Sequence, residues 1–260
     1  YIDITEKYDE LVANPNIRKT KIKARDLETE ISKLQQESGY PYVINIDTAN
    51  RENPIDGKII MSNLCSEILQ VQTPSVINGK QEYEVLGTDI SCNLGSTNIV
   101  NLMQSPNFGQ SVRTMTRALT FITDASDIDV VPPIQNGNKL NHTIGLGAMG
   151  LHTYLAKEQM EYGSEDSLDF TNIYFMLLNY WTLVESNNIA RERKQVFHNF
   201  EKSAYADGTY FEKYVTGEFQ PKSEKVKALF EGIFIPTAED WNALKQAVMK
   251  DGLYHQNRLA

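Results

Sequence analysis

The sequence predicts a mixed α/β fold, and three observations support that class. Several segments repeat apolar residues at helical spacing and end at recognisable capping residues. Between them lie short stretches rich in β-branched residues, bounded by turn-forming residues. The chain has 260 residues, 41% of them hydrophobic, which is enough to bury a substantial core in one or two domains.

The first half of the chain contains two predicted helices. Residues 22–38 repeat apolar side chains at helical spacing, and Gly39 follows as a C-cap. Residues 109–125 predict an amphipathic helix, whose apolar face comprises Val112, Met115, Leu119 and Ile122.

The second half contains two further predicted helices. From Ser167 to about Val196 the chain is densely apolar and then strongly charged, which indicates a long helix buried at its start and exposed at its end. The last helix starts at a capping box formed by Thr237 and Asp240, and Gly252 ends it.

Extended segments are predicted between these helices. Residues 42–47 (YVINID) alternate and are β-rich, so we expect a strand there. Residues 58–73 lack helix-start signals and predict an extended, hairpin-like path, and residues 77–91 add a turn and a strand. Residues 129–141 (DVVPPIQNGNKLN) predict a loop.

Charge and hydropathy narrow the function classes. The net charge is −9 and the pI is near 5.0, whereas polyanion binders cluster Lys and Arg, so no nucleic-acid polymer is an expected partner. A single nucleotide is compatible, because backbone N–H groups can hold one phosphate. No run of 18 apolar residues and no signal-peptide pattern occur, so we expect a cytoplasmic protein without a membrane partner.

Two cysteines are too few for a disulfide-stapled domain, so a disulfide here would serve chemistry rather than architecture. The four histidines are scattered without metal-ligand spacing, so no zinc site is expected. Asn63, Cys65 and Glu67 are spaced two apart and would project from one face of a strand. Spacing alone favours a plainer alternative, a strand with a buried free cysteine and two solvated neighbours.

The motif GLGAMG at residues 145–150 matches the glycine spacing of a dinucleotide fingerprint, with Glu165 at a suitable distance. The preceding strand would comprise only HTI at residues 142–144, whereas the fingerprint needs a buried strand that leads into the turn. We therefore expect close helix packing here and no dinucleotide.

Three motifs in order carry a family resemblance: SNLCSEI, then SCNLGSTNI, then IGLGAMGLHTYLA. Together they resemble the catalytic α subunit of aerobic class I ribonucleotide reductases, most closely class Ib. The resemblance covers the whole chain but only the middle-to-late part of such a subunit. It implies a ten-stranded α/β barrel with a central finger loop, of which residues 1–260 would form a partial catalytic barrel domain.

The resemblance also implies roles for residues. Cys65 would become a thiyl radical and abstract the 3′-hydrogen of a ribonucleoside diphosphate, Glu67 would take the 3′-hydroxyl proton, and Asn63 would hydrogen-bond the substrate hydroxyls. Cys92 would be one half of the redox pair that reduces the 2′ position, its partner being absent from this sequence. We expect both cysteines to face one cavity. The implied substrate-binding residues are Asn63, Leu64, Cys65, Ser66, Glu67 and Leu94.

By the same resemblance this chain binds no cofactor itself. A small β subunit with a dimetal-tyrosyl radical would supply the radical, and a glutaredoxin-like or thioredoxin-like thiol would supply electrons. Nucleotide effectors would bind outside this chain, and the full-length subunit would be a homodimer. Several family segments are missing, so we expect a split, intein-interrupted or truncated subunit that is inactive alone.

Two alternatives stay open at the level of sequence. Cys65 could be the nucleophile of a hydrolase or transferase, which needs a base, usually His, to generate the thiolate. The chain could also be a non-catalytic nucleotide-binding or assembly module.

Overall fold

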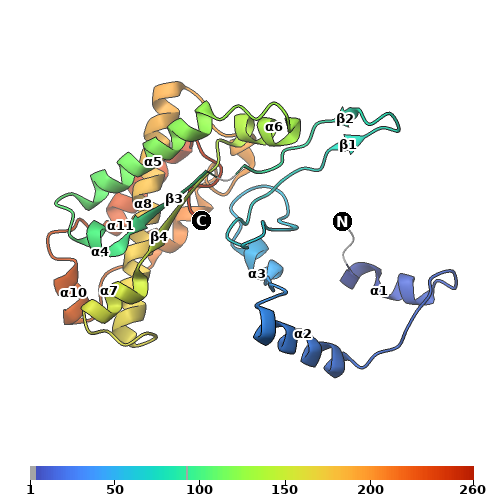
Figure 1. Ribbon diagram of the computed structural model, residues 1–260. Helices are drawn as coiled ribbons and strands as arrows, with labels where there is room; N and C mark the ends of the chain where they lie inside the picture. Colours follow the sequence, from blue (N-terminus) through green and yellow to red (C-terminus); the bar gives the residue numbers. More distant parts are fainter. Residues whose placement is uncertain (1–3, 92) are drawn as a thin grey trace.

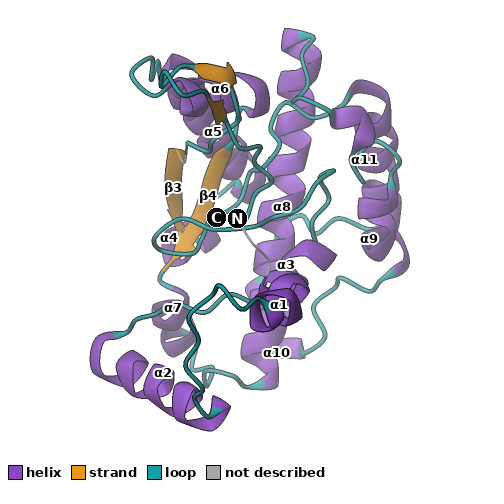
Figure 2. Cartoon of the chain, turned by 90° about the vertical axis from the view of Figure 1, so that its right-hand side faces the viewer, coloured by secondary structure: helices purple, strands orange, loops and turns teal. Residues whose placement is uncertain are grey.

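The computed structural model describes residues 4–91 and 93–260 and has a mixed α/β fold (Figures 1 and 2). In chain order the elements are α1 (Ile4–Ala13), α2 (Ala24–Ser38), α3 (Ile46–Arg51), β1 (Val76–Ile77), β2 (Tyr83–Val85), β3 (Asn93–Asn98), α4 (Ile99–Met103), α5 (Phe108–Ala125), α6 (Pro132–Asn141), β4 (Ile144–Met149), α7 (Leu151–Lys157), α8 (Glu165–Arg193), the 3₁₀ turns η1 (Phe200–Lys202) and η2 (Thr209–Phe211), α9 (Glu212–Thr216), α10 (Glu224–Leu229) and α11 (Ala238–Asp251).

Helix α8 is the axis of the main body. Its buried positions run around most of its circumference, which is typical of a helix enclosed by other elements. Helix α5 packs along one side of it, and α10 and α11 pack against it elsewhere (Figure 1). A single large apolar cluster joins these helices to the sheet.

Strands β3 and β4 are parallel, in register from the pair Asn93 and Ile144 to the pair Asn98 and Met149. Parallel strands need a crossover connection, and α4, α5 and α6 provide it. The end of the chain adds a third parallel segment, because Leu146 N–H donates to Arg258 O at 2.8 Å and Leu146 bridges Leu259. The described residues do not close a barrel.

A buried carboxylate ties α5 to α8. Glu185 of α8 has a side chain only 1% exposed, and it accepts hydrogen bonds from Arg113 (Nε to Oε2, 2.5 Å) and Arg117 of α5. On the solvent side, Arg117 also pairs with Glu192. Two partly exposed guanidinium groups thus neutralise one buried charge between the helices.

The first three helices lie outside this body. None of α1, α2 and α3 contains a buried residue, and Figure 1 shows α1 and α2 projecting away from α8. Helix α2 still ends as predicted, at Gly39 with a left-handed φ of 79°. Its sequence signals are therefore local rather than dependent on packing.

The predicted helices are confirmed: α5, α8 and α11 lie where periodicity placed them, and α11 has both bonds of the Thr237–Asp240 capping box. The turn and strand predicted over residues 77–91 are present as the β1–β2 hairpin.

Two predictions of extended structure are wrong. Residues 42–45 are irregular and α3 begins at Ile46, where a strand was predicted. Val43 is 69% exposed, and an unpaired strand leaves its backbone groups without ladder partners. In the segment 58–73, Thr73 forms an antiparallel bridge with Thr88, but residues 58–72 are mostly irregular and contain a turn. Side chains rather than a second strand satisfy part of the backbone there.

The predicted loop over residues 129–141 is also wrong, since α6 covers Pro132–Asn141. The two prolines occupy the first helical turn, where a missing N–H costs nothing. Gly137 lies against the backbone of Asp89, where an added Cβ would come within 2.0 Å of the Asp89 carbonyl oxygen. Tertiary packing therefore favours a glycine in this helix despite its low helical propensity.

We predict that Glu185→Gln lowers the free energy of unfolding by roughly 1–3 kcal/mol, because both arginines lose a buried counter-charge. The matched control is Glu192→Gln, which removes the solvent-exposed partner of the same Arg117 and should cost less than about 1 kcal/mol. Denaturant unfolding of both variants measures the difference. Equal losses would show that the buried pair does not hold α5 on α8.

Candidate active site

Cys65 lies at the tip of a tight turn. Ser66 N–H donates to Asn63 O at 3.1 Å, and Ser66 has a left-handed φ of 65°. Leu64 and Cys65 occupy the two positions between them, and both side chains are exposed, Leu64 by 77%. The turn therefore presents the thiol outward.

Two side chains on the limb before this turn anchor it to Ile68, which lies on the limb after the turn and is buried. Ile68 N–H donates to Asn63 Oδ1 at 3.1 Å, and Ser62 Oγ–H donates to Ile68 O at 2.7 Å. We call residues 62–68 the thiol loop. The two limbs of the turn, which the structure describes in full, are not paired with each other as strands. The side-chain bonds to the Ile68 backbone therefore determine the path of the thiol loop.

A second anchor of the same kind precedes the thiol loop. The Asn50 side chain accepts from Ile59 N–H and donates to Ile59 O, both at 2.8 Å. Ile59 is buried as well, so each end of residues 59–68 is fixed by an amide side chain at a buried isoleucine. The sequence analysis did not assign the anchoring roles of Asn50 and Ser62. The available signal was that Asn and Ser side chains often bond to nearby backbone groups.

The strand face predicted for Asn63, Cys65 and Glu67 is wrong. The backbone turns at residues 63–66, and the Asn63 carboxamide oxygen is directed back to Ile68. Glu67 is half-buried, and its Oε2 is buried without a hydrogen-bond partner among the described residues. Asn63, Cys65 and Glu67 thus belong to one anchored turn, and their joint approach to a substrate stays a prediction.

A shallow cavity of about 380 Å³ lies beside the thiol. It is lined by Gln35, Gly39, Pro41, Tyr42, Val43, Cys65 and Ser66. Tyr42 stacks on Tyr40 with ring centroids 4.9 Å apart. A hydrogen bond between the two tyrosines, with a smaller effect of nearby Cys65, raises the pKa of Tyr42. The stretch GYPY at residues 39–42 contributes Gly39, Pro41 and Tyr42 to the lining of this cavity, and its paired tyrosines were the sequence signal that could have indicated it.

The second cysteine, Cys92, lies outside the described residues, so its predicted approach to Cys65 stays a prediction. Its neighbours are attached to the helical layer. Ser91 Oγ donates to Asn138 at 3.1 Å, and Asn93 Nδ2 donates to Thr123 Oγ1 at 2.8 Å.

Leu94, in contrast, is 52% exposed, on the face of β3 that it shares with Ser96 and Asn98. Residues on the opposite face pack inward, for example Thr97, which bonds Tyr174 at 2.9 Å. The structure therefore places Leu94 on the open side of the sheet.

The glycine motif lies in a strand and not in a phosphate-binding turn. Strand β4 starts at Ile144 and runs to Met149, so the predicted short strand HTI is wrong and two of the glycines lie within the strand. Only Gly150, with φ of 82°, separates the strand from α7. Gly147 pairs with Ser96, and a Cβ there would be 3.5 Å from Ala260 O.

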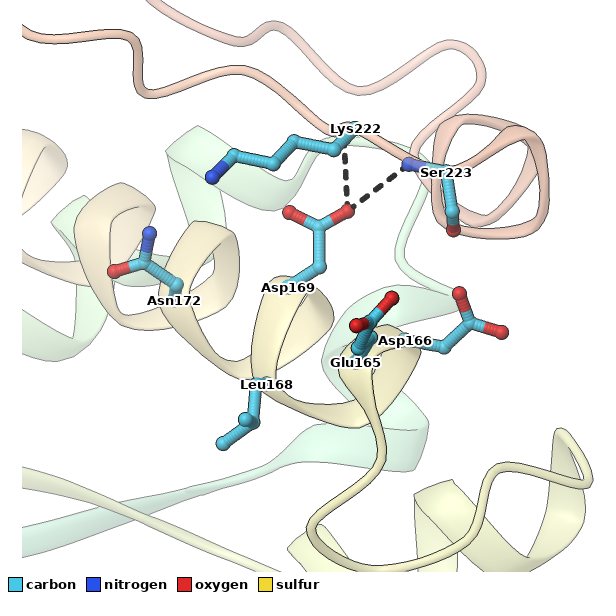
Figure 3. Close-up of a pocket in the computed structure, with 7 residues that line it drawn as sticks. All are labelled: Glu165, Asp166, Leu168, Asp169, Asn172, Lys222 and Ser223. Carbon is cyan, nitrogen blue, oxygen red and sulfur yellow. Dashed lines mark hydrogen bonds between the residues drawn. The ribbon is translucent and has the colours of Figure 1, made fainter.

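A separate cavity of about 490 Å³ lies at the start of α8 (Figure 3). There Asp169 accepts hydrogen bonds from the backbone N–H groups of Lys222 (2.8 Å) and Ser223 (3.3 Å). Glu165 and Asp166 are in the first turn of the helix, where the helix dipole stabilises negative charge. These carboxylates thus have a structural explanation, and none belongs to the predicted site.

A polar cluster lines a further cavity of about 560 Å³. The His142 ring stacks on the Tyr254 ring with centroids 4.1 Å apart. The Arg193 guanidinium also lies over the Tyr254 ring, 4.6 Å from its centroid. Burial on its own would raise the pKa of Asp124. Hydrogen bonds from His142, Arg193 and Tyr254 outweigh burial and lower that pKa to about 2. Asp124 therefore stays ionised across the physiological range.

In the parts of the chain that the structure describes, no group of three His, Cys, Asp or Glu side chains is arranged to hold a metal ion. Within those same parts, no helix is long and apolar enough to span a bilayer.

Fold and site together define a class, an α/β domain that contains a parallel sheet and presents an exposed thiol on an anchored turn. A family model described as the barrel domain of ribonucleotide reductase matches residues 2–260, and the chain belongs to this family. The resemblance of the three motifs to that family is thereby confirmed.

Relatives support the same family. The chain is 43% identical over 260 residues to the ribonucleoside-diphosphate reductase subunit alpha of Bacillus subtilis. This match covers 99% of this chain and 37% of that protein. The chain is 44% identical over 265 residues to the subunit of the same name from Mycoplasma pneumoniae, with 100% and 37% covered. The Helicobacter pylori subunit is 27% identical over 299 residues, with 96% and 36% covered. The chain thus spans little more than a third of the length of these relatives.

Buried His255 should make stability depend on pH. Its ring nitrogens bond Thr120 and Ser186, each at 2.9 Å. Burial, assisted by the positive charge of Arg258, lowers the pKa of His255 well below 6.5, although Asp124 partly opposes this. Below about pH 6.5 the unfolded chain therefore binds a proton that the folded chain does not.

We predict that the free energy of unfolding falls between pH 7 and 5, by up to about 1.4 kcal/mol per pH unit from this residue. Denaturant unfolding across this range measures the slope. His255→Gln should flatten it, whereas the control His198→Gln, at an exposed position, should leave it unchanged. An unaltered slope in His255→Gln would contradict the assignment.

Proposed function

We propose that this chain is the part of a ribonucleoside-diphosphate reductase α subunit that carries the hydrogen-abstracting cysteine, Cys65. The observation that supports this most directly is the exposed thiol at the tip of a turn whose two limbs are joined by the Ser62 and Asn63 side chains at buried Ile68. Membership of the ribonucleotide reductase family adds support from sequence. The substrate would be a ribonucleoside diphosphate and the product the 2′-deoxyribonucleoside diphosphate.

In this proposal the Cys65 thiyl radical abstracts the 3′-hydrogen, so that an S–H bond forms as the C3′–H bond breaks. Glu67 accepts the 3′-hydroxyl proton, a role compatible with its unpartnered carboxylate oxygen. Asn63 donates a hydrogen bond from Nδ2 to a substrate hydroxyl. The anchored turn holds these groups near one sugar ring, which lowers the entropic cost of reaching the reactive geometry.

Cys92 and a second thiol, outside this chain, then supply the two electrons that reduce the 2′ position and end as a disulfide. Leu94 contacts the substrate base, which its exposed place on β3 would permit. Leu64 and Ser66 contact the substrate through the same turn as Cys65. A glutaredoxin-like or thioredoxin-like thiol re-reduces the disulfide.

The remaining assignments concern the complete enzyme. A small β subunit with a dimetal-tyrosyl radical supplies the oxidising equivalent, and class Ib is the closest type. Strands β3 and β4 and residues 257–260 contribute to a ten-stranded barrel, with residues 1–260 as part of its catalytic domain. Nucleotide effectors bind outside this segment of a homodimeric subunit, and the enzyme supplies DNA replication in the cytoplasm.

A cysteine nucleophile for hydrolysis or group transfer is less well supported. That chemistry needs a base beside the thiol. The side chains that line the cavity at Cys65 include no histidine among the described residues. A purely non-catalytic binding module would leave the anchored thiol without a purpose, so neither alternative is proposed.

In the full-length subunit assayed with its radical-supplying partner, we predict that Cys65→Ser abolishes deoxynucleotide formation at every pH. An alcohol O–H bond is much stronger than a thiol S–H bond, so the radical cannot pass to the serine oxygen. Product analysis and the persistence of the partner's radical on mixing with substrate measure this. Retained turnover in Cys65→Ser would refute the proposal.

Replacing the other two groups should give distinguishable results. Glu67→Gln should keep substrate binding but slow the reaction by roughly 10²–10⁴-fold, as for a lost general base. The control is Glu84→Gln, on the exposed hairpin strand β2, which should not change the rate. Cys92→Ser should permit hydrogen abstraction but stall reduction. Loss of abstraction in Cys92→Ser would reverse the assignment of the two sulfurs.

A further inference from the structure

The orientation of the Asn63 carboxamide is determined by the loop itself. Ile68 N–H is a donor 3.1 Å from the side chain of Asn63, so the amide oxygen must face it. In the reversed orientation, the Asn63 Nδ2 donor would face the Ile68 N–H donor. Nδ2 therefore points away from Ile68, and it has no hydrogen-bond partner in the described part of the chain.

Ser62 completes the same ring of contacts. Its hydroxyl donates to Ile68 O at 2.7 Å and also lies 3.2 Å from Asn63 Oδ1. One hydroxyl thus contacts both the anchor and the carboxamide oxygen. Removing it would leave the Ile68 carbonyl without this donor and free the Asn63 side chain on one side.

We propose that Ser62 is a positioning residue that acts through Asn63. It keeps Oδ1 at the base of the thiol loop, and hence leaves the two Nδ2 protons free to bind a substrate hydroxyl. This inference rests on the proposed function, because it assigns Asn63 Nδ2 as the donor to substrate. Ser62 itself does not touch the substrate.

The role needs a side chain because no strand among the described residues pairs with the loop. Apart from the turn bond from Ser66 to Asn63, the hydrogen bonds that close the thiol loop within the described residues come from the Ser62 and Asn63 side chains. Ile68 is buried and therefore fixed to the body, whereas Leu64 and Cys65 are exposed. Motion at the tip is thus limited mainly by these two side chains.

The test uses the full-length subunit, assayed with its partner and a ribonucleoside diphosphate. Ser62→Ala should lower kcat about three- to tenfold, the effect of one lost hydrogen bond, with a smaller change in KM. Ser62→Thr keeps the hydroxyl and should restore most of kcat. The matched control is Ser126→Ala, which removes another hydroxyl that donates to a backbone carbonyl at 2.7 Å, far along the chain at the end of α5.

A double-mutant cycle separates positioning from a general structural effect. Asn63→Asp keeps an oxygen for Ile68 N–H but removes the Nδ2 donor. If Ser62 acts through Asn63, the Ser62→Ala and Asn63→Asp double variant should be no slower than Asn63→Asp alone, within about twofold. Fully multiplicative losses, or an equal loss in Ser126→Ala, would overturn the inference.

The remaining outcomes distinguish failure of the Ser62 inference from failure of the proposed function. Failure of Ser62→Ala to fold would overturn the positioning role, because the hydroxyl would then support the fold. Wild-type kcat in Ser62→Ala would overturn the inference alone. Absence of deoxynucleotide formation by the wild-type subunit with its partner would instead refute the proposed function.

Discussion

The buried carboxylate of Glu185 between Arg113 and Arg117 is the interaction on which the main body depends. It joins α5, the crossover helix between β3 and β4, to α8, the axis of the core. The parallel sheet packs on these helices, so the position of β3 follows from that pairing. A buried charge is tolerated there because two guanidinium groups neutralise it at once.

A different constraint shapes the thiol loop. No strand in the described ranges pairs with its backbone, yet buried N–H and C=O groups must find partners. Asn50 meets this requirement at Ile59, and Ser62 with Asn63 meets it at Ile68. Rigid anchors on either side of an exposed cysteine combine access with a defined position, which the proposed radical chemistry on one sugar ring would require.

Much of the fold could be predicted because its signals are local. The caps of α2 and α11 depend on residues a few positions apart, and the structure contains both. The apolar face predicted for α5 is right at Val112 and Leu119 but wrong at Ile122, which is 49% exposed. The failures share one cause. The fate of residues 42–47 and of α6 depended on partners distant in sequence, such as the Asp89 backbone against Gly137.

By itself the sequence determined the α/β class, the main helices and the family, since each is written in residue types at short spacing. The tertiary structure alone decided that Asn63, Cys65 and Glu67 belong to a turn and that the glycines of GLGAMG lie inside a parallel strand. It also decided which way the Asn63 carboxamide faces. The physical reason is that backbone hydrogen bonds are completed by whichever groups the folded chain brings near, and spacing along the sequence does not name those groups.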